Sequence, residues 1–221
     1  MLRTELITHF REMADDLVDN PYLWPDNLVN SYAILAENEA CSRKPLLVDR
    51  STEALCKIDV TEGTSAYTTN SAVRQIFKAS LIYDSDTSTE IRLYITDIDE
   101  LNVIDPDWQD DTSLTKYLIV EDSSVTLWPV PEDDAALWLE VSHVPLTEEA
   151  SFTISSSHHF MLVFYMLYLA YNKSDSDTHN PKRAYEYEAI FSAYFGPKPD
   201  ANKVKSVRQV RSDRSIQGWP I

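Results

Sequence analysis

Hydrophobic positions near the start of the chain recur at three- and four-residue intervals. This spacing predicts an amphipathic helix over Thr4–Val18, which ends before Asn20 and Pro21 because proline cannot continue a helix. Asp26 has the residue type of an N-cap, and a second helix is expected from there to about Ser42. Two short amphipathic helices with a brief connection should pack antiparallel.

Between residues 46 and 154 the period changes to short alternating or β-rich runs, which clusters of Asp, Ser and Thr separate. One such cluster, Asp84–Thr89, is expected to be a connection. Six runs of this length predict a small antiparallel sandwich or folded sheet. The expected strands are Ala54–Val60, Ile76–Tyr83, Ile91–Thr96, Tyr117–Glu121, Val125–Pro129 and Ala136–Val144.

Helical spacing returns after the serine run Ser155–Ser157. The helix expected over His158–Lys173 is apolar on nearly all sides, so it should be central or sandwiched between partners. The next helix has Pro181 at its first position and should end at Gly196, before another proline. From Lys198 onward no amphipathic stripe is sustained, and an extended segment is expected.

These patterns predict an α+β fold. Residues 1–45 and 155–197 should form a helical bundle, residues 46–154 an inserted antiparallel β-rich domain, and residues 198–221 an extended C-terminal arm. The longest apolar run, Phe160–Tyr171, is shorter than the roughly 20 residues that a membrane span needs, so no membrane contact is expected. The first residues also lack the continuous apolar core of a secretory signal, so we expect a soluble protein.

Glycine scarcity bounds the chemistry. The three glycines, Gly63, Gly196 and Gly218, are far apart, whereas loops that bind phosphates with their backbone need clustered glycines. We therefore expect no nucleotide and no other cofactor. Cys41 and Cys56 fit neither a disulfide framework nor a zinc site, and two buried thiols are expected.

The acidic segment 97–111 is the best metal candidate. It lacks the glycine and the carboxylate spacing of a calcium loop, so a solvated acidic loop is expected, with a metal-dependent hydrolase as the alternative. His158 and His159 point about 100° apart on a helix and cannot share an ion, so we expect one in the core and one at its edge. We assign no catalytic, cofactor-binding or metal-binding residue and expect a non-enzyme.

Charge is distributed unevenly along the chain, whose net charge is −17. The arm, residues 198–221, holds six basic and two acidic residues (+4), while the remainder holds 13 basic and 34 acidic residues (−21). An acidic body argues against wrapping nucleic acid, and a basic arm should dock on another chain, including another copy. We expect charge pairing and apolar anchoring by arm residues, namely Arg208, Arg211 and Arg214 for charge and Ile216 and Trp219 as anchors.

Three tyrosines follow three-residue spacing on the apolar helix. Tyr165, Tyr168 and Tyr171 fit either a core stripe or an intersubunit seam, because tyrosine is enriched at interfaces where one edge stays wet. Both interpretations stay open at this point.

The sequence resembles the head-to-tail adaptor (connector) proteins of short-tailed bacteriophages. The resemblance is carried, in order along the chain, by three groups of segments: His9–Val18 with Pro21–Trp24, Val125–Pro131, and Ala170–Ala184 with Phe191–Gly196.

The resemblance implies a homo-oligomeric ring, usually of twelve copies, below the portal in the neck of the virion. The helical bundle would frame the DNA channel, the arm would clasp the portal, and the lower face would receive the tail nozzle. DNA would pass without sequence-specific binding, and assembly would take place in the host cytoplasm. A different neck part, such as a stopper or the upper ring of the nozzle, is the alternative.

Overall fold

The computed structural model describes residues 2–18, 21–111, 113–146, 151–174 and 178–199. Within these ranges the protein is a mixed α+β fold with six α-helices and two sheets, so the predicted class is confirmed. The chain divides into two compact units. The helical unit comprises residues up to Leu47 together with His143–Lys198, and the β unit comprises Val48–Ser142. No helix in the described part of the chain is long and apolar enough to span a membrane.

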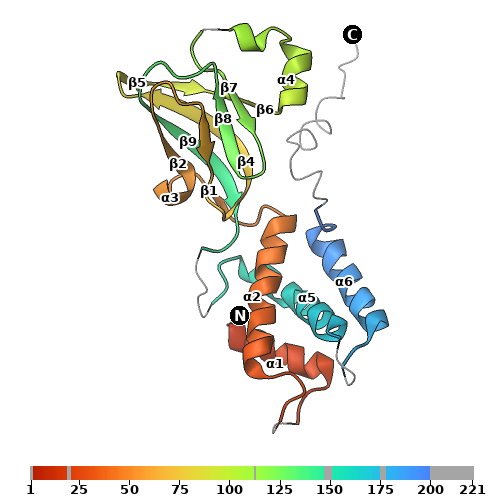
Figure 1. Ribbon diagram of the computed structural model, residues 1–221. Helices are drawn as coiled ribbons and strands as arrows, with labels where there is room; N and C mark the ends of the chain where they lie inside the picture. The colour runs from red at the N-terminus through yellow and green to blue at the C-terminus, as the bar shows by residue number, and fades with distance from the viewer. Residues whose placement is uncertain (1, 19–20, 112, 147–150, 175–177, 200–221) are drawn as a thin grey trace, which may run out of the picture. The chain divides into compact units, whose positions relative to one another are not determined.

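The helical unit contains α1 (Arg3–Ala14), α2 (Asp26–Arg43), α5 (His159–Asn172) and α6 (Pro181–Phe195). Helix α5 packs against each of the other three, and Figure 1 shows it in teal among them. Its side chains explain this position, because Tyr165 and Leu167 point about 200° apart around the helix and both are buried. The apolar helix is thus covered from several directions by segments from both ends of the sequence.

The first helix is shorter than predicted. It ends at Ala14 because Asp15 adopts a left-handed conformation (φ 58°), and the Asp15 and Asp16 amides bond back to carbonyls of the last turn. Leu17 and Val18, which the hydrophobic stripe included, are therefore outside the helix and 62% and 81% exposed.

The two histidines at the start of α5 have different surroundings, as predicted. His159 is buried, with its Nε2 2.9 Å from the Ile154 carbonyl oxygen, and His158 is half-buried beside Tyr194. The extended segment that precedes them is fixed by Glu37 of α2. Its buried carboxylate accepts hydrogen bonds from the amides of Thr153 (2.6 Å) and Ile154 (3.2 Å).

The β unit holds two sheets with a shared core. One has the order β1-β9-β4-β5 with β2 also paired to β9, and the other has the order β3-β8-β7-β6. Buried leucines of both sheets meet between them, Leu81, Leu137 and Leu139 from the first and Leu118 and Leu127 from the second. The strands are β1 (Val48–Asp49), β2 (Lys57–Val60), β3 (Ala66–Thr68), β4 (Val73–Tyr83), β5 (Asp86–Arg92), β6 (Tyr94–Thr96), β7 (Tyr117–Val120), β8 (Ser124–Trp128) and β9 (Ala135–His143).

Two strand predictions need correction. The run Ala54–Val60 begins as a short helix, α3 (Glu53–Cys56), and only its second half forms β2. The run Ile91–Thr96 is split between β5 and β6, and β5 begins inside the polar cluster that was expected to be a connection. In β5 the residues from Asp86 to Glu90 are exposed, so hydrogen bonds to β4 define this strand and an apolar face does not.

The antiparallel prediction is also wrong for one pair. Strands β6 and β7 are parallel, with Tyr94 opposite Tyr117. Parallel neighbours require a long crossover. Residues 97–116 supply it (here called the crossover), and they contain α4 (Ile98–Ile104) and the 3-10 helix η1 (Trp108–Asp110).

Candidate interaction site

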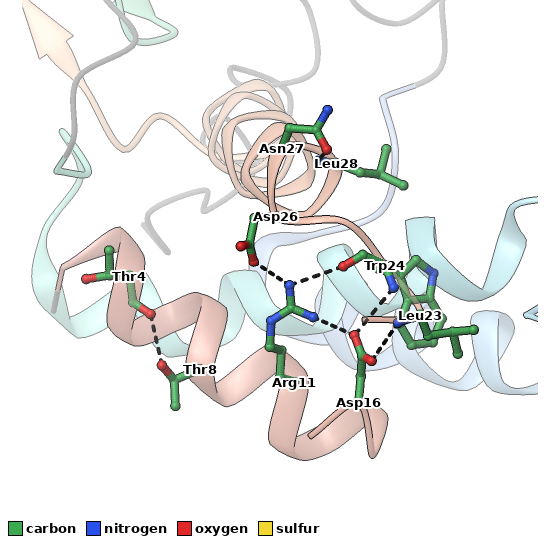
Figure 2. A network of polar contacts seen from close by, with 9 residues as sticks. All are labelled: Thr4, Thr8, Arg11, Asp16, Leu23, Trp24, Asp26, Asn27 and Leu28. Carbon is green, nitrogen blue, oxygen red and sulfur yellow. Dashed lines mark hydrogen bonds and ion pairs between the residues drawn. The ribbon is translucent and has the colours of Figure 1, made fainter. Parts of the chain in front are cut away.

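Arg11 is the centre of a polar network that holds the turn between α1 and α2 (Figure 2). Its guanidinium donates to Asp16 (2.5 Å), to the Trp24 carbonyl (3.1 Å) and to Asp26 (2.5 Å). Asp16 in turn accepts hydrogen bonds from the amides of Leu23 and Trp24. The Arg11 and Asp16 side chains are only 8% and 4% exposed, so most of this ion pair is shielded from solvent.

Asp26 does not have the predicted capping role. The N-cap of α2 is Pro25, and the Asp26 carboxylate turns to Arg11. Beneath this turn the Trp24 indole is buried, and its ring meets those of Phe10 and Tyr171 edge-on at 5.7 and 5.6 Å. The network therefore places one aromatic anchor against both α1 and α5.

A second buried arginine lies where α6 ends. Arg43, whose side chain is 1% exposed, donates from Nε to Glu39 and from Nη1 to Glu188 and Ser192 of α6. The same Nη1 also reaches the carbonyl oxygen of Gly196 (3.2 Å). Because Gly196 lies two residues before the predicted arm, Arg43 fixes the backbone close to the point at which the arm begins.

The three tyrosines of α5 have different surroundings. Tyr165 is buried against Phe191, and burial raises the pKa of its phenol to about 12. Tyr171 is also buried and donates to the Ala14 carbonyl oxygen. Tyr168 is half-buried. Tyr165 and Tyr171 contribute to packing inside the helical unit, and the intersubunit seam stays a prediction to which Tyr168 offers the more accessible ring.

The acidic segment 97–111 is not a continuous loop as expected, because it contains α4 and η1, although several of its carboxylates are exposed to solvent. Asp97 caps α4 by accepting from the Glu100 amide (2.7 Å), and Asp105 accepts from the Tyr117 hydroxyl (3.1 Å). Asp111 pairs with Lys116, whose hydrogen bond lowers the Asp111 pKa to about 2. No three His, Cys, Asp or Glu side chains among the described residues are grouped to hold a metal ion.

A shallow hollow of about 340 Å³ lies on the sheet that contains β4, β5 and β9. It lies on the outer face of these strands, lined in part by Trp138 and by the ion pair of Lys78 with Glu140 (2.6 Å). Both thiols are buried as predicted, Cys41 in the helical unit and Cys56 in the β unit, where burial raises the Cys56 pKa to about 11.

Most of the negative charge belongs to the β unit. Residues 48–142 contain 20 acidic and six basic side chains, a net charge of −14. Residues 1–47 with 143–197 contain 14 acidic and seven basic side chains, a net charge of −7. The arm, at +4, is the one strongly basic segment of the sequence.

A family model described as "SU10 adaptor protein" matches residues 1–214, nearly the whole chain. The chain belongs to the SU10 adaptor protein family. This confirms the resemblance to phage head-to-tail adaptors, whose place is the neck of the virion. None of the curated proteins compared with the chain matches it.

Two of the three groups of segments that resemble phage adaptors supply turn and helix-cap contacts in the helical unit of this SU10 adaptor. The first segment supplies Phe10, Arg11 and Asp16, and its companion supplies Leu23 and Trp24. In the third, Asn180 caps α6 by accepting from the Arg183 amide (3.1 Å). These motifs therefore specify turns and helix ends of the helical unit.

Sequence reasoning missed the buried charges of the SU10 adaptor. The sequence pattern assigned no role to Arg11 or Arg43, although Arg11 adjoins the apolar stripe and Arg43 lies in the last turn of its helix. The predicted arm residues Arg208, Arg211, Arg214, Ile216 and Trp219 lie outside the described residues, so their roles stay predictions.

Replacing Arg11 with methionine should destabilise the helical unit. Asp16 would keep its two backbone hydrogen bonds but lose its cation while buried, and removal of one partner of such a pair costs roughly 3–5 kcal/mol. Equilibrium urea unfolding would measure the loss. Asp26→Asn is the matched control, because this carboxylate is 76% exposed and should contribute little. Equal losses in both variants would contradict the network.

Replacing Arg43 with lysine should loosen the end of α6 although the charge is kept. A single ammonium cannot reproduce the fork that joins Glu39, Glu188, Ser192 and Gly196. Hydrogen exchange should accelerate at the Gly196 amide, which donates to the Ser192 carbonyl, while the amides of α1 keep their protection. Arg43→Met should lose about 2–4 kcal/mol of unfolding free energy. Unchanged exchange at Gly196 in both variants would refute the anchoring role.

Proposed function

We propose that this protein is a structural head-to-tail adaptor that forms an oligomeric ring below the phage portal. The ring, of about twelve copies by the resemblance to short-tailed phage adaptors, extends the DNA channel and gives the tail nozzle a docking platform. The observation that carries the proposal is the segregation of charge in a member of the SU10 adaptor family, with two acidic units followed by a basic arm.

Charge supports the channel role. DNA that must pass through quickly should not adhere to the wall, and like charge on a surface repels phosphate. Both units are net negative, −7 for residues 1–47 with 143–197 of the helical unit and −14 for the β unit, so either would repel DNA if it faced the channel. Affinity for phosphate would require lysine and arginine in excess, which neither unit has.

Side-chain exposure supports contacts between copies. A ring needs two different complementary surfaces on each subunit. The outer side of α6 exposes Tyr185 (75%) and Ile190 (41%), and the turn after α1 exposes Leu17 and Val18. Each subunit would make contacts of modest size with its neighbours and with the portal, and simultaneous contacts would make the assembly strong.

The arm supplies the connection to other chains. Arg208, Arg211 and Arg214 are proposed to pair with acidic surfaces, and Ile216 and Trp219 to fill apolar pockets on the portal side. Arg43 supports this role indirectly, because it holds Gly196 and so gives every copy the same starting point for its arm.

Deleting residues 198–221 should leave the protein folded but abolish its attachment to the portal. Co-sedimentation with purified portal rings would measure attachment, and thermal unfolding would check that the body keeps its stability. Arg208→Gln, Arg211→Gln and Arg214→Gln together should weaken attachment less at high salt than at low salt, because screening already removes much of their contribution there. Ile216→Ser together with Trp219→Ser should weaken attachment to the portal at both high and low salt.

A truncated protein that still binds the portal would refute the arm assignment. Full-length protein that binds only a tail protein, and never the portal, would instead indicate a stopper or the upper ring of the nozzle.

A further inference from the structure

Apolar side chains are exposed to solvent on the crossover of the β unit. Val103 is 76% exposed, Leu114 65%, Ile104 53% and Ile98 45%. These are four of the six large hydrophobic side chains that are exposed in the described part of this unit. Figure 1 shows α4 outside the sheet that contains β6 and β7.

One side of helix α4 is buried against the rest of the β unit. Leu101 is fully buried and packs with Trp108 of η1 and Ile119 of β7. Val103 follows two residues later, about 200° around the helix, so it points away from that core. Solvent-exposed apolar groups of this kind, with polar residues around them, are typical of an interaction surface.

The charges around this face select the chemistry of a partner. Seven acidic side chains and no lysine or arginine occur in residues 97–111. Asp97, Asp105 and Asp111 are occupied with capping, with Tyr117 and with Lys116. Three further carboxylates are exposed and belong to none of the ion pairs between described residues, namely Asp99, Asp107 and Asp110. A fitting partner is therefore basic and carries apolar side chains.

The arm has this chemistry. Its 24 residues include six basic and two acidic side chains, and residues 203–211 interleave Val204, Val207 and Val210 with Lys205, Arg208 and Arg211. At about 3.3 Å per residue an extended arm spans up to roughly 80 Å, enough to leave its own subunit and cross a neighbour before it reaches the portal. Because a closed ring joins two different surfaces of adjacent subunits, an arm and an acidic apolar face form a suitable pair.

We propose that the crossover surface around Ile98, Val103 and Asp99 is the docking site for the basic arm of a second copy of this chain. The proposal rests on the proposed function, since it names the surface on which the arm lies between neighbouring subunits. The contact would connect each adaptor to the next independently of what the end of the arm does at the portal.

Cysteine cross-linking between full-length chains tests the proposal. One variant carries Gln109→Cys in the crossover and the other carries Ser206→Cys in the arm, while Cys41 and Cys56 are buried. The two are mixed with purified portal rings and oxidised mildly. We expect a covalent adaptor dimer on a non-reducing gel. Gln75→Cys is the matched control, because Gln75 is also an exposed glutamine of the β unit, and its yield should be at least about tenfold lower, as expected for an unlinked site without raised local concentration.

Charge variants separate this site from general attraction to an acidic unit. Asp99→Asn, Asp107→Asn and Asp110→Asn together should remove most of the cross-link. Glu62→Gln, Asp122→Asn and Glu132→Gln remove the same charge from exposed positions elsewhere in the β unit and should not. Val103→Ser with Ile104→Ser should also reduce the yield.

Each other outcome overturns a defined part of the account. Equal yields at positions 75 and 109 would mean that the arm meets the β unit without a preferred site. A chain carrying both Gln109→Cys and Ser206→Cys that cross-links only within itself would refute the second copy as the source. No cross-link in protein that co-sediments with the portal would refute this docking site and leave the proposed function intact, whereas parent protein that fails to co-sediment would refute the proposed function.

Discussion

The burial of α5 is the constraint on which the rest of the helical unit depends. A helix whose side chains are apolar on nearly every side is stable in water only when other elements cover it. The cover comes from α1 and α2, which precede the β unit in sequence, and from α6, which follows it. Covering α5 therefore brings the two ends of the inserted segment together, and the His143 amide donates to the Leu47 carbonyl oxygen at 3.2 Å. The β unit can thus be added to the helical unit without interrupting the core.

Hydrophobic burial alone would not fix how the covering helices are connected and where the chain leaves them. Buried arginines do this. Arg11 donates to the Trp24 carbonyl and to the Asp26 carboxylate in the turn between α1 and α2. Arg43, at the end of α2, donates to the Gly196 carbonyl at the end of α6. A turn conformation that separates such a pair would leave a buried charge without its partner, which lowers the stability of the fold, so alternative turn conformations are unfavourable. Each adaptor copy should therefore present its arm from the same position, and the proposed ring would require such uniformity.

The sequence was sufficient for most elements and insufficient for the crossover. Periodicity predicted the bounds of α2, α5 and α6 to within about one residue. Their apolar patterns are clear, and Pro181 and Gly196 mark the start and the end of α6. Periodicity made α1 too long, because Leu17 and Val18 continue the hydrophobic stripe. The helix ends earlier because the Asp16 carboxylate accepts hydrogen bonds from the Leu23 and Trp24 amides, which are distant in sequence. Segment 97–111 was interpreted as solvated because of its acids. Its helix depends on Leu101 packing against Ile119, a long-range contact that periodicity over seven residues does not reveal. The buried roles of Arg11 and Arg43 were missed for the same reason, because their partners are far apart in sequence.

The unequal charge of the two units implies different contributions to assembly. At physiological ionic strength, screening confines electrostatic attraction to about 8 Å, so the −14 of the β unit acts mainly on a chain that is already close. It would select a basic partner and orient it, and salt would weaken that selection. The helical unit carries half that charge and exposes Tyr185, Leu17 and Val18, so its contacts would depend on apolar burial, which salt does not weaken. A ring that uses both kinds of contact can remain closed by apolar surfaces while charge determines which chains dock on it. In the proposed ring, self-repulsion would be strongest in the β unit, while the exposed apolar side chains of the helical unit and of the crossover would supply contacts that salt does not weaken.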